Sequence, residues 1–334
     1  MAFLTQRPWV RSMGMFRPKA IDFQKTKTFP TASRHNLVRI DTLQTPGVTP
    51  IQPFESVELD LLAQKISQAR EANAPVIFFM GAHVIKCGLS RYLIDLMRDG
   101  FITHLASNGA GSIHDFELAY LGGTSEDVPS AIQDGSFGMW EETGRWMNEA
   151  VQAGYRQGLG YGQSLAEYVE KHQDRFPYLA DCLFYQAWRM GVPATYHITI
   201  GTDIIHQHPI ADFAALGGAS GIDFAVFCAA VSGLDGGVHM NVGSAVTGPE
   251  VFLKALSIAR NQGYPASRIT TANFDLLDLG EYHASVGQDK YNYYYRPLKN
   301  VITRPTASGG TGLYIRGNHL LTVPALWQRL KGTE

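Results

Sequence analysis

Four polar residues in the sequence have side chains that could move a proton or hold a charged substrate. His114 and Asp115 are adjacent, and Lys86 lies in an earlier glycine-bearing stretch. Asp203 follows a later apolar run. An imidazole titrates near neutral pH and suits a general base, while a lysine can hold an anionic group. Such residues are more often simple hydrogen-bonding groups, but several on one face favour catalysis, so we predict a catalytic site from these four.

A second set of residues has the side chains that zinc or iron prefers, imidazole and carboxylate. The set comprises His197, Asp203, His206, His208 and His239. His206 and His208 are two positions apart, which places both on one side only in an extended segment. We predict no metal site, and a metal-dependent enzyme remains the alternative.

The segments around these residues alternate between two periodicities. Residues 54–73 have apolar side chains at spacings of three and four, which predicts an amphipathic helix. Residues 74–81 form a short apolar run with β-branched and aromatic side chains, which is typical of a buried parallel strand. The same alternation continues along the chain. It predicts an α/β fold with a Rossmann-like parallel sheet and helices on both faces.

Glycine-bearing loops follow the predicted strands, at the edge where ligands of open α/β sheets bind. Glycine lets a backbone approach a ligand closely, and free amides at a helix start attract phosphate. The loops at 81–88 and 107–111 therefore predict a nucleotide-sized site, and the loop at 243–250 adds Gly243 and Ser244. None of these loops matches the dinucleotide fingerprint G-x-G-x-x-G or the P-loop.

The order of these segments resembles deoxyhypusine synthases. Residues 78–123 are similar to the region of that family where a strand, a Ser/Asn-bearing loop and an R-Y-L helix lead to a second strand and a T-T-A-G-G-type loop. That loop is followed in the family by paired acids and Y-L-G. Residues 132–142, 191–203 and 269–275 resemble further segments of the family, so the likeness extends in patches over most of the chain.

The resemblance implies an NAD site at the strand ends, commonly at a subunit interface of a homotetramer. The cofactor residues implied by it are Ala82, His83, Ser107, Asn108, Gly109, Ala110, Gly111 and Asp275. With Gly243 and Ser244 they form the predicted cofactor set.

The chain departs from the family at the residues that carry its reaction. In deoxyhypusine synthases a lysine after a G-G-G-V loop forms an imine that carries the aminobutyl group. Here Gly248 is near that position, and Lys254 lies inside a predicted helix. The paired acids that bind the polyamine correspond to His114 and Asp115. We therefore predict an NAD-dependent enzyme that acts on a small molecule and does not make deoxyhypusine, or else a nucleotide-binding protein without catalysis.

Composition limits the partners and the compartment. The chain has 334 residues, 45% of them hydrophobic, so it can bury a large core, and its net charge of −2 gives no general attraction for nucleic acid or anionic lipid. The longest apolar run, residues 219–234, contains Asp223 and is predicted to be a buried helix. Three cysteines without a C-x-x-C pair fit a reducing compartment. We predict a cytoplasmic protein that binds neither nucleic acid nor membrane.

The chain is predicted to have two parts. Residues 1–50 are basic and broken by prolines, which indicates an arm that packs on the domain or on a neighbouring subunit. Residues 51–334 are predicted to form a single α/β nucleotide-binding domain with a C-terminal extension. The tyrosine-rich segment 289–295 is typical of a subunit interface. Together these features predict a homotetramer.

Overall fold

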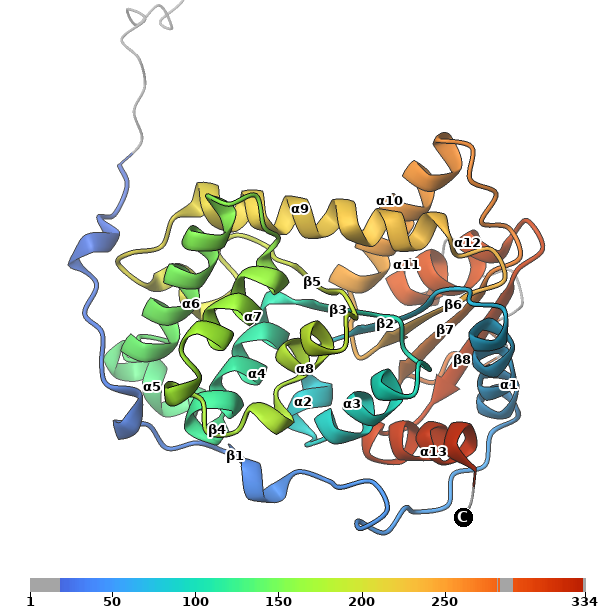
Figure 1. The fold of residues 1–334 in the computed structure, drawn as a ribbon, viewed down its shortest axis with the longest axis horizontal. Coiled ribbons are helices and arrows are strands. Elements are labelled where there is room, and N and C mark those ends of the chain that lie inside the picture. Colours follow the sequence, from blue (N-terminus) through green and yellow to red (C-terminus); the bar gives the residue numbers. More distant parts are fainter. Residues whose placement is uncertain (1–18, 281, 283–290, 333–334) are drawn as a thin grey trace, which may run out of the picture.

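Six strands form one parallel sheet through the molecule (Figure 1). The computed structural model describes residues 19–280, 282 and 291–332. In spatial order the strands are β5 (Ala194–His197), β3 (His104–Asn108), β2 (Val76–Met80), β6 (Val238–Val242), β7 (Thr270–Asp275) and β8 (Thr311–Arg316). Counted along the chain, this is the order 3-2-1-4-5-6 of the Rossmann fold. The predicted α/β class is confirmed.

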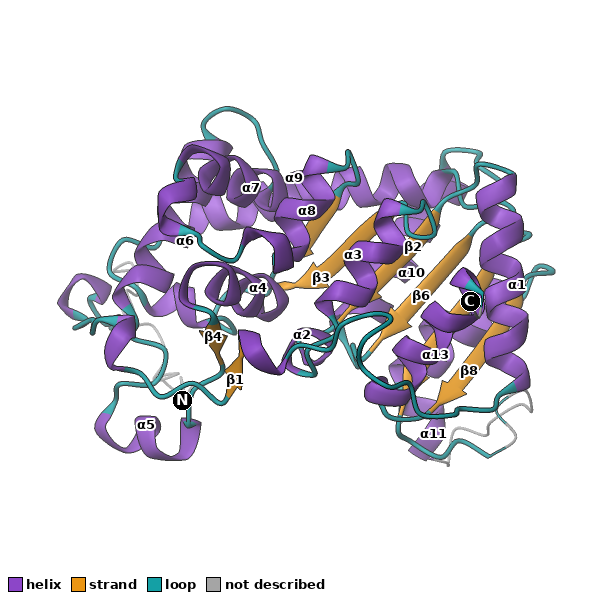
Figure 2. Ribbon diagram, turned by 60° about the horizontal axis from the view of Figure 1, so that its bottom comes forward, coloured by secondary structure: helices purple, strands orange, loops and turns teal. Residues whose placement is uncertain are grey.

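Helices cover both faces of the sheet (Figure 2). Side chains alternate along a strand, so Phe78 of β2 packs into one core and Phe79 into the opposite one. One face is covered by α1 (Val57–Glu71), α3 (Ser90–Arg98) and α13 (His319–Lys331), and the other by α9 (Phe213–Ser232) and α10 (Thr247–Asn261). Both faces are therefore buried, which explains the nearly continuous apolar runs of the strands.

The connection from β3 to β5 builds a helical lobe with its own core. This lobe contains α4 (Gly109–Leu121), β4 (Gly123–Thr124), α5 (Val128–Asp134), α6 (Glu141–Tyr155), α7 (Tyr161–Lys171) and α8 (Leu183–Arg189). Phe116, Met147, Leu165 and Phe184 belong to its core, which is separate from the two cores against the sheet. Residues 51–334 thus contain more than one core, which the periodicities did not indicate.

Shorter elements connect the main ones. They are α2 (His83–Lys86), α11 (Tyr291–Tyr294), α12 (Arg304–Thr306), the π-helical turn η7 (Leu298–Thr303), and the 3-10 turns η1 (Phe23–Lys25), η2 (Thr31–Ser33), η3 (Ile40–Thr42), η4 (Gln173–Arg175), η5 (Leu179–Asp181) and η6 (Ile204–Gln207). Two of them, α2 and η6, follow sheet strands directly and so border the ligand-binding edge.

The N-terminal arm runs over the helical lobe of its own chain (Figure 1). Its strand β1 (Val38–Arg39) pairs antiparallel with β4. Thr31 donates from its amide and its hydroxyl to Glu142 of α6, both at 2.7 Å. Residues 19–50 pack on the helical lobe of their own chain, which is one of the two partners expected for the arm, and residues 1–18 lie outside the described residues.

Helix α9 lies along one edge of the molecule. Its Asp223 is buried, and the carboxylate accepts from the amides of Gly162 at 3.0 Å and Tyr196 at 2.7 Å. The outer face of the helix carries small exposed residues, Gly217 and Gly221 among them. Among the described residues, α9 is the one helix that passes a test of length and composition for crossing a membrane, and a core helix of a soluble protein passes the same test.

Candidate active site

A cavity of about 230 Å³ lies beyond the carboxyl ends of β2, β3 and β5. It brings together three of the four predicted catalytic residues, Lys86 of α2, His114 of α4 and Asp203 before η6. The lining residues are Arg34, Lys86, Ala110, Ile113, His114, Glu117, Ser125, Glu126, Val128, Phe137, Thr202, Asp203 and Ile204. The volume is below the range of about 300–1,000 Å³ that is typical for drug-sized ligands, so the cavity suits a small metabolite.

His114 is the end of a hydrogen-bonded relay that crosses the wall of this cavity. Its Nδ1 lies 2.7 Å from the hydroxyl of Thr124, and that hydroxyl donates to Glu117 at 2.5 Å. Thr124 has a single hydroxyl proton, so Nδ1 of His114 must be the donor in the first bond. The relay therefore leaves the lone pair of the imidazole on Nε2.

The imidazole of His114 is held in its neutral form. The pKa of His114 is lowered to about 4, mainly by burial. Glu117 acts in the opposite direction, and Lys86 and Arg34 act in the same direction as burial. A neutral ring with a free Nε2 can accept a proton at neutral pH. The Glu117 carboxylate behind Thr124 stabilises the positive charge that such a transfer creates.

Arg34 of the arm was not among the predicted site residues, although it lines the cavity. It forms a buried ion pair with Glu117, with 2.7 Å between Nη1 and Oε1, and only 3% and 1% of the two side chains are exposed. Its Nε donates to Asn36 at 2.9 Å. Its remaining nitrogen, Nη2, is buried and has no hydrogen-bond partner among the described residues. This nitrogen therefore has no acceptor among the described residues.

Asp203 presents a carboxylate to the same cavity. Its side chain is 6% exposed, and its Oδ2 has no hydrogen-bond partner in the described part of the chain. Burial raises the pKa of Asp203 to about 6, so the group is mainly ionised at neutral pH. A buried charged oxygen without a partner is costly, and a donor on a ligand would offset that cost.

Glycine at position 109 is required by this arrangement. A Cβ at Gly109 would lie 2.0 Å from Oδ2 of Asp203 and 2.6 Å from its Cγ. A Cβ at Gly111 would lie 2.1 Å from the hydroxyl of Ser107. The glycines of this loop therefore make room for the protein's own side chains. Both glycines belong to the predicted cofactor set.

Asp115 faces away from the cavity, unlike its neighbour His114. Its carboxylate is fully buried in the helical lobe and accepts from the amides of Leu183 and Phe184, each at 2.9 Å. These two amides begin α8, so Asp115 satisfies the start of that helix. The structure gives Asp115 this supporting position and does not bring it to the other three predicted catalytic residues.

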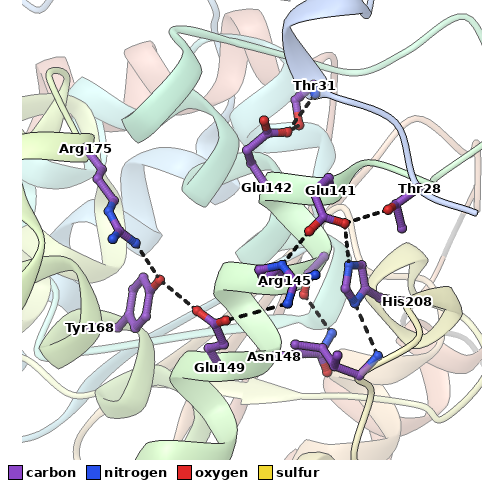
Figure 3. A network of polar contacts seen from close by, with 12 residues as sticks. Thr28, Thr31, Glu141, Glu142, Arg145, Asn148, Glu149, Tyr168, Arg175 and His208 are labelled. Carbon is purple, nitrogen blue, oxygen red and sulfur yellow. Dashed lines mark hydrogen bonds and ion pairs between the residues drawn. The ribbon is translucent and has the colours of Figure 1, made fainter. Parts of the chain in front are cut away.

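The residues of the alternative metal set do not converge. His197 stacks on Phe79 inside the sheet core, with 5.5 Å between ring centroids, and His239 stacks on Phe252 at 3.8 Å. His208 lies 3.2 Å from Glu141 of α6 (Figure 3). Within residues 19–280, 282 and 291–332, no group of three metal-ligating side chains is present.

The remaining histidine of that set, His206, forms hydrogen bonds with backbone groups. Its Nδ1 accepts from the amides of Gly201 and Asp203, each at 3.2 Å. Asn148 of α6 donates to the carbonyl of Ile205 at 2.9 Å. These bonds hold the loop that carries Asp203 against α6.

The predicted cofactor residues lie along the carboxyl edge of the sheet, and several of their polar groups are occupied. Ser107 donates to the carbonyl of Met80 at 2.9 Å, and Asn108 caps α4 by accepting from Gly111 at 3.0 Å. Ser244 accepts from the amide of Gly248 at 2.9 Å at the start of α10. These side chains shape the loops.

The first residues after β2 and β6 meet at the centre of this edge. A Cβ at Gly81 would lie 2.2 Å from the carbonyl oxygen of Gly243. Gly243 has a φ of +68°, and a Cβ there would lie 2.6 Å from Nε2 of His319. His319 faces His83 with 6.2 Å between ring centroids. Ala82 lies between Gly81 and His83, at the start of α2.

Asp275 ends β7 on the same edge. Its carboxylate accepts from the hydroxyl of Tyr295 and from the amide of Leu276 at 2.7 Å. Asp275 therefore lies at a strand end, and part of its hydrogen-bonding capacity is used by Tyr295. The segment 289–290 of the predicted tyrosine-rich interface lies outside the described residues, and Tyr294 of the same segment is 65% exposed.

The sequence indicates the strand ends, but not the residues that complete the cavity. Glu117 is three positions after His114 on one helix, which places both on the same face and was a usable signal. Thr124 and Glu126 follow α4 in a segment without a motif. Arg34 comes from an arm that is distant in sequence, so no local pattern indicates it.

No protein-family model and no curated protein matches the chain. Among solved structures it is similar to the ternary complex of AgrE with ornithine and NAD+, with 16% identity, a TM-score of 0.50 and 85% of this chain covered. This chain spans about a third of that one, 34% of its length. A conserved putative LOR/SDH protein from Methanococcus maripaludis S2 has 15% identity and a TM-score of 0.48, over 86% of this chain and 73% of its own. At such identities the likeness to AgrE shows a shared fold.

Proposed function

We propose that the protein is an NAD-dependent enzyme that acts on a small molecule in the cavity beside His114. The observation that carries this proposal is the free Nε2 of a neutral imidazole next to two buried charged groups, Arg34 and Asp203. One atom of each, Arg34 Nη2 and Asp203 Oδ2, has no hydrogen-bond partner among the described residues. Unsatisfied charges of this kind are costly in a structural core and are typical of a functional site.

The choice of NAD is supported by the position of the cavity in the fold. Strand order reverses between β2 and β6, and dinucleotides bind at such a point in doubly wound sheets. The amino-terminal ends of α4 and α10 lie at the same edge and favour the phosphates of a cofactor. AgrE, which shares the fold, was solved with ornithine and NAD+. When bound, NAD exchanges a hydride with a substrate.

His114 is the proposed general base. Its Nε2 would take a proton from the substrate, and Glu117 would stabilise the resulting imidazolium through Thr124. Lys86 lines the cavity and is exposed to solvent, which supports its assignment to the attraction of an anionic group. Neither role requires Asp115.

We propose that the chain has the scaffold of deoxyhypusine synthases and catalyses a different reaction. A Cβ at Gly248, near the place of the family's lysine, would lie 2.2 Å from Oδ1 of Asn241, so no larger side chain fits there without rearrangement. Lys254 is on the solvent side of α10 and pairs with Glu250. Borohydride trapping with spermidine and NAD tests this point. We expect no lysine adduct, and an adduct on Lys86 or Lys254 would contradict it.

Turnover assays on a panel of small metabolites test the proposed enzyme. NADH formation is followed by absorbance for the parent protein and for His114→Gln, which keeps a polar side chain and removes the base. We expect a loss of about 10²-fold or more in kcat with NAD binding retained, because general base catalysis contributes about 10²–10⁴-fold. Equal kcat values in parent and variant would refute the role of His114.

We also propose that the protein is a cytoplasmic homotetramer that binds neither nucleic acid nor membrane. The small, uncharged outer face of α9 and the exposed Tyr294 support a subunit contact. The low net charge supports the absence of a nucleic-acid partner.

A further inference from the structure

We infer that the cavity beside His114 binds the zwitterion of an α-amino acid. This inference rests on the proposed function for the identity of the site and adds the substrate class. It comes from two groups of opposite charge on one cavity wall, Arg34 and Asp203, each buried and each with one atom that lacks a partner among the described residues.

The carboxylate of the ligand is assigned to Arg34. Its Nη1 is used by Glu117 and its Nε by Asn36, so Nη2 remains as a donor. A guanidinium binds a carboxylate through charge-assisted hydrogen bonds, which are stronger than neutral ones. Lys86 lines the same cavity and adds a second positive charge for an anion.

The ammonium group of the ligand is assigned to Asp203. Its Oδ2 accepts no hydrogen bond from the described residues, and an ammonium supplies three donors. His206 lies 3.9 Å from this oxygen, beyond hydrogen-bonding distance, and burial lowers the pKa of His206. A neutral histidine at that distance leaves Oδ2 of Asp203 without a donor among the described residues, while the rest of the carboxylate caps η6.

The wall as a whole favours a ligand with a further positive charge. Arg34 and Lys86 face three carboxylates, those of Glu117, Glu126 and Asp203. One negative charge therefore remains when all five groups are ionised. A basic amino acid balances it, whereas a dicarboxylic acid would add to it. The volume of about 230 Å³ limits the ligand to a small molecule of this class.

A series of ligands tests the assignment on the full-length parent protein. This test does not depend on whether variants of the protein fold. Titration calorimetry compares L-ornithine with 1,4-diaminobutane, which lacks the carboxylate, and with 5-aminopentanoate, which lacks the α-amino group. We expect each deletion to weaken binding about tenfold or more, the loss expected for a hydrogen bond to a charged group. If 1,4-diaminobutane binds as tightly as L-ornithine, the assignment of the carboxylate to Arg34 is wrong.

Two variants connect each ligand group to its residue. Arg34→Lys keeps the charge beside Glu117 and loses Nη2, so it should weaken L-ornithine about tenfold and leave 1,4-diaminobutane unchanged. Asp203→Asn should weaken L-ornithine about tenfold and leave 5-aminopentanoate unchanged. The exposed pair Arg39 and Asp41 on the arm provides matched controls, Arg39→Lys and Asp41→Asn, which should bind as the parent does.

NAD+ is titrated into the same samples to separate this inference from the proposed function. Binding of NAD+ without binding of L-ornithine or any other L-amino acid in a panel would overturn the inference and leave the cofactor proposal standing. Binding of L-ornithine by a protein that does not bind NAD+ would overturn the cofactor proposal and leave this inference standing. Variants that weaken all three ligands of the series equally would also overturn the assignment of separate groups.

Discussion

Among the single residues of the site, Gly109 is as important as the charged side chains because it has no side chain. Gly109 follows β3 and gives up its Cβ position to the carboxylate of Asp203. Its sequence context, a glycine-bearing loop after an apolar run, had indicated close approach of a cofactor. A group does lie close to Gly109, and it is the Asp203 carboxylate of the protein itself.

Substitution of Gly109 by alanine tests this close packing. The new Cβ would lie 2.0 Å from Oδ2 of Asp203, so the Asp203 loop must move. We expect a loss of about 1–3 kcal/mol in the free energy of unfolding, measured with urea, which is the usual cost of overpacking. Gly221→Ala on the outer face of α9 is the matched control, since a Cβ there meets nothing within 4 Å. The Gly221→Ala variant should have a free energy of unfolding about 0.5–1 kcal/mol higher than the parent. Equal effects would contradict the packing argument.

Buried histidines give the stability a defined dependence on pH. Both ring nitrogens of His239 lack hydrogen-bond partners within the described residues, and burial lowers the pKa of His239 to about 3. In the unfolded chain the group takes up a proton below about pH 6.5, which the folded protein does not do until the pH is much lower. Its contribution to stability is present above pH 6.5 and is lost as the pH falls.

The variant His239→Leu isolates this effect. Between pH 7 and pH 5 the parent should lose about 1–2 kcal/mol more of its unfolding free energy than the variant. The comparison between proteins is needed because Asp115 and Asp223, whose pKa values burial raises to about 7, stabilise the fold as the pH falls through the same range. His35→Leu on the exposed arm is the control. Identical pH profiles of parent and His239→Leu would show that His239 has the same pKa in the folded and unfolded states, which contradicts its burial as a neutral ring.

At the scale of elements, α6 holds together two segments that are far apart in sequence. Thr28 and Thr31 of the arm donate to Glu141 and Glu142, and His208 contacts Glu141 on the side of the Asp203 loop (Figure 3). The arm brings Arg34 to the cavity, and the loop brings Asp203. One helix therefore sets the relative position of the two charges proposed to bind a zwitterion.

Glu142→Ala should release the arm without disturbing the rest of α6. Hydrogen exchange of the Thr31 amide should become about tenfold faster, because this amide loses its bond to a carboxylate. Glu149→Ala removes a carboxylate from the same helix that contacts Tyr168 and not the arm, and serves as the control. Unchanged exchange at Thr31 in the first variant would mean that the arm is held elsewhere.

The sequence predicts the sheet more fully than the site. Buried parallel strands leave apolar runs, and the residues after each run lie at one edge by geometry, so Lys86, His114 and Asp203 could be grouped in advance. The sequence could not show which of His114 and Asp115 faces the cavity. Adjacent residues of a helix point in different directions, and the packing of α4 against α8 decides which one turns inward. The helical lobe has the same periodicity as the helices of the sheet, and only tertiary packing gives it a core of its own.

At the scale of the whole molecule, assembly is the first point to measure. The described part of the arm is committed to its own chain, which leaves α9 and the segment around Tyr294 as the faces for a second copy. We expect light scattering at micromolar protein to give the mass of a tetramer, or at least of a dimer. The mass of a monomer would contradict the proposed assembly and would leave the cavity, which lies within one chain, unaffected.

We propose that the carboxyl edge of this sheet binds NAD beside a small-molecule cavity. Titration calorimetry of NAD+ and NADH into the full-length protein, with ATP and FAD as competitors, measures this binding. We expect saturable binding of NAD+ or NADH at one site per chain that neither competitor displaces. Absence of binding at millimolar NAD+ and NADH would contradict it.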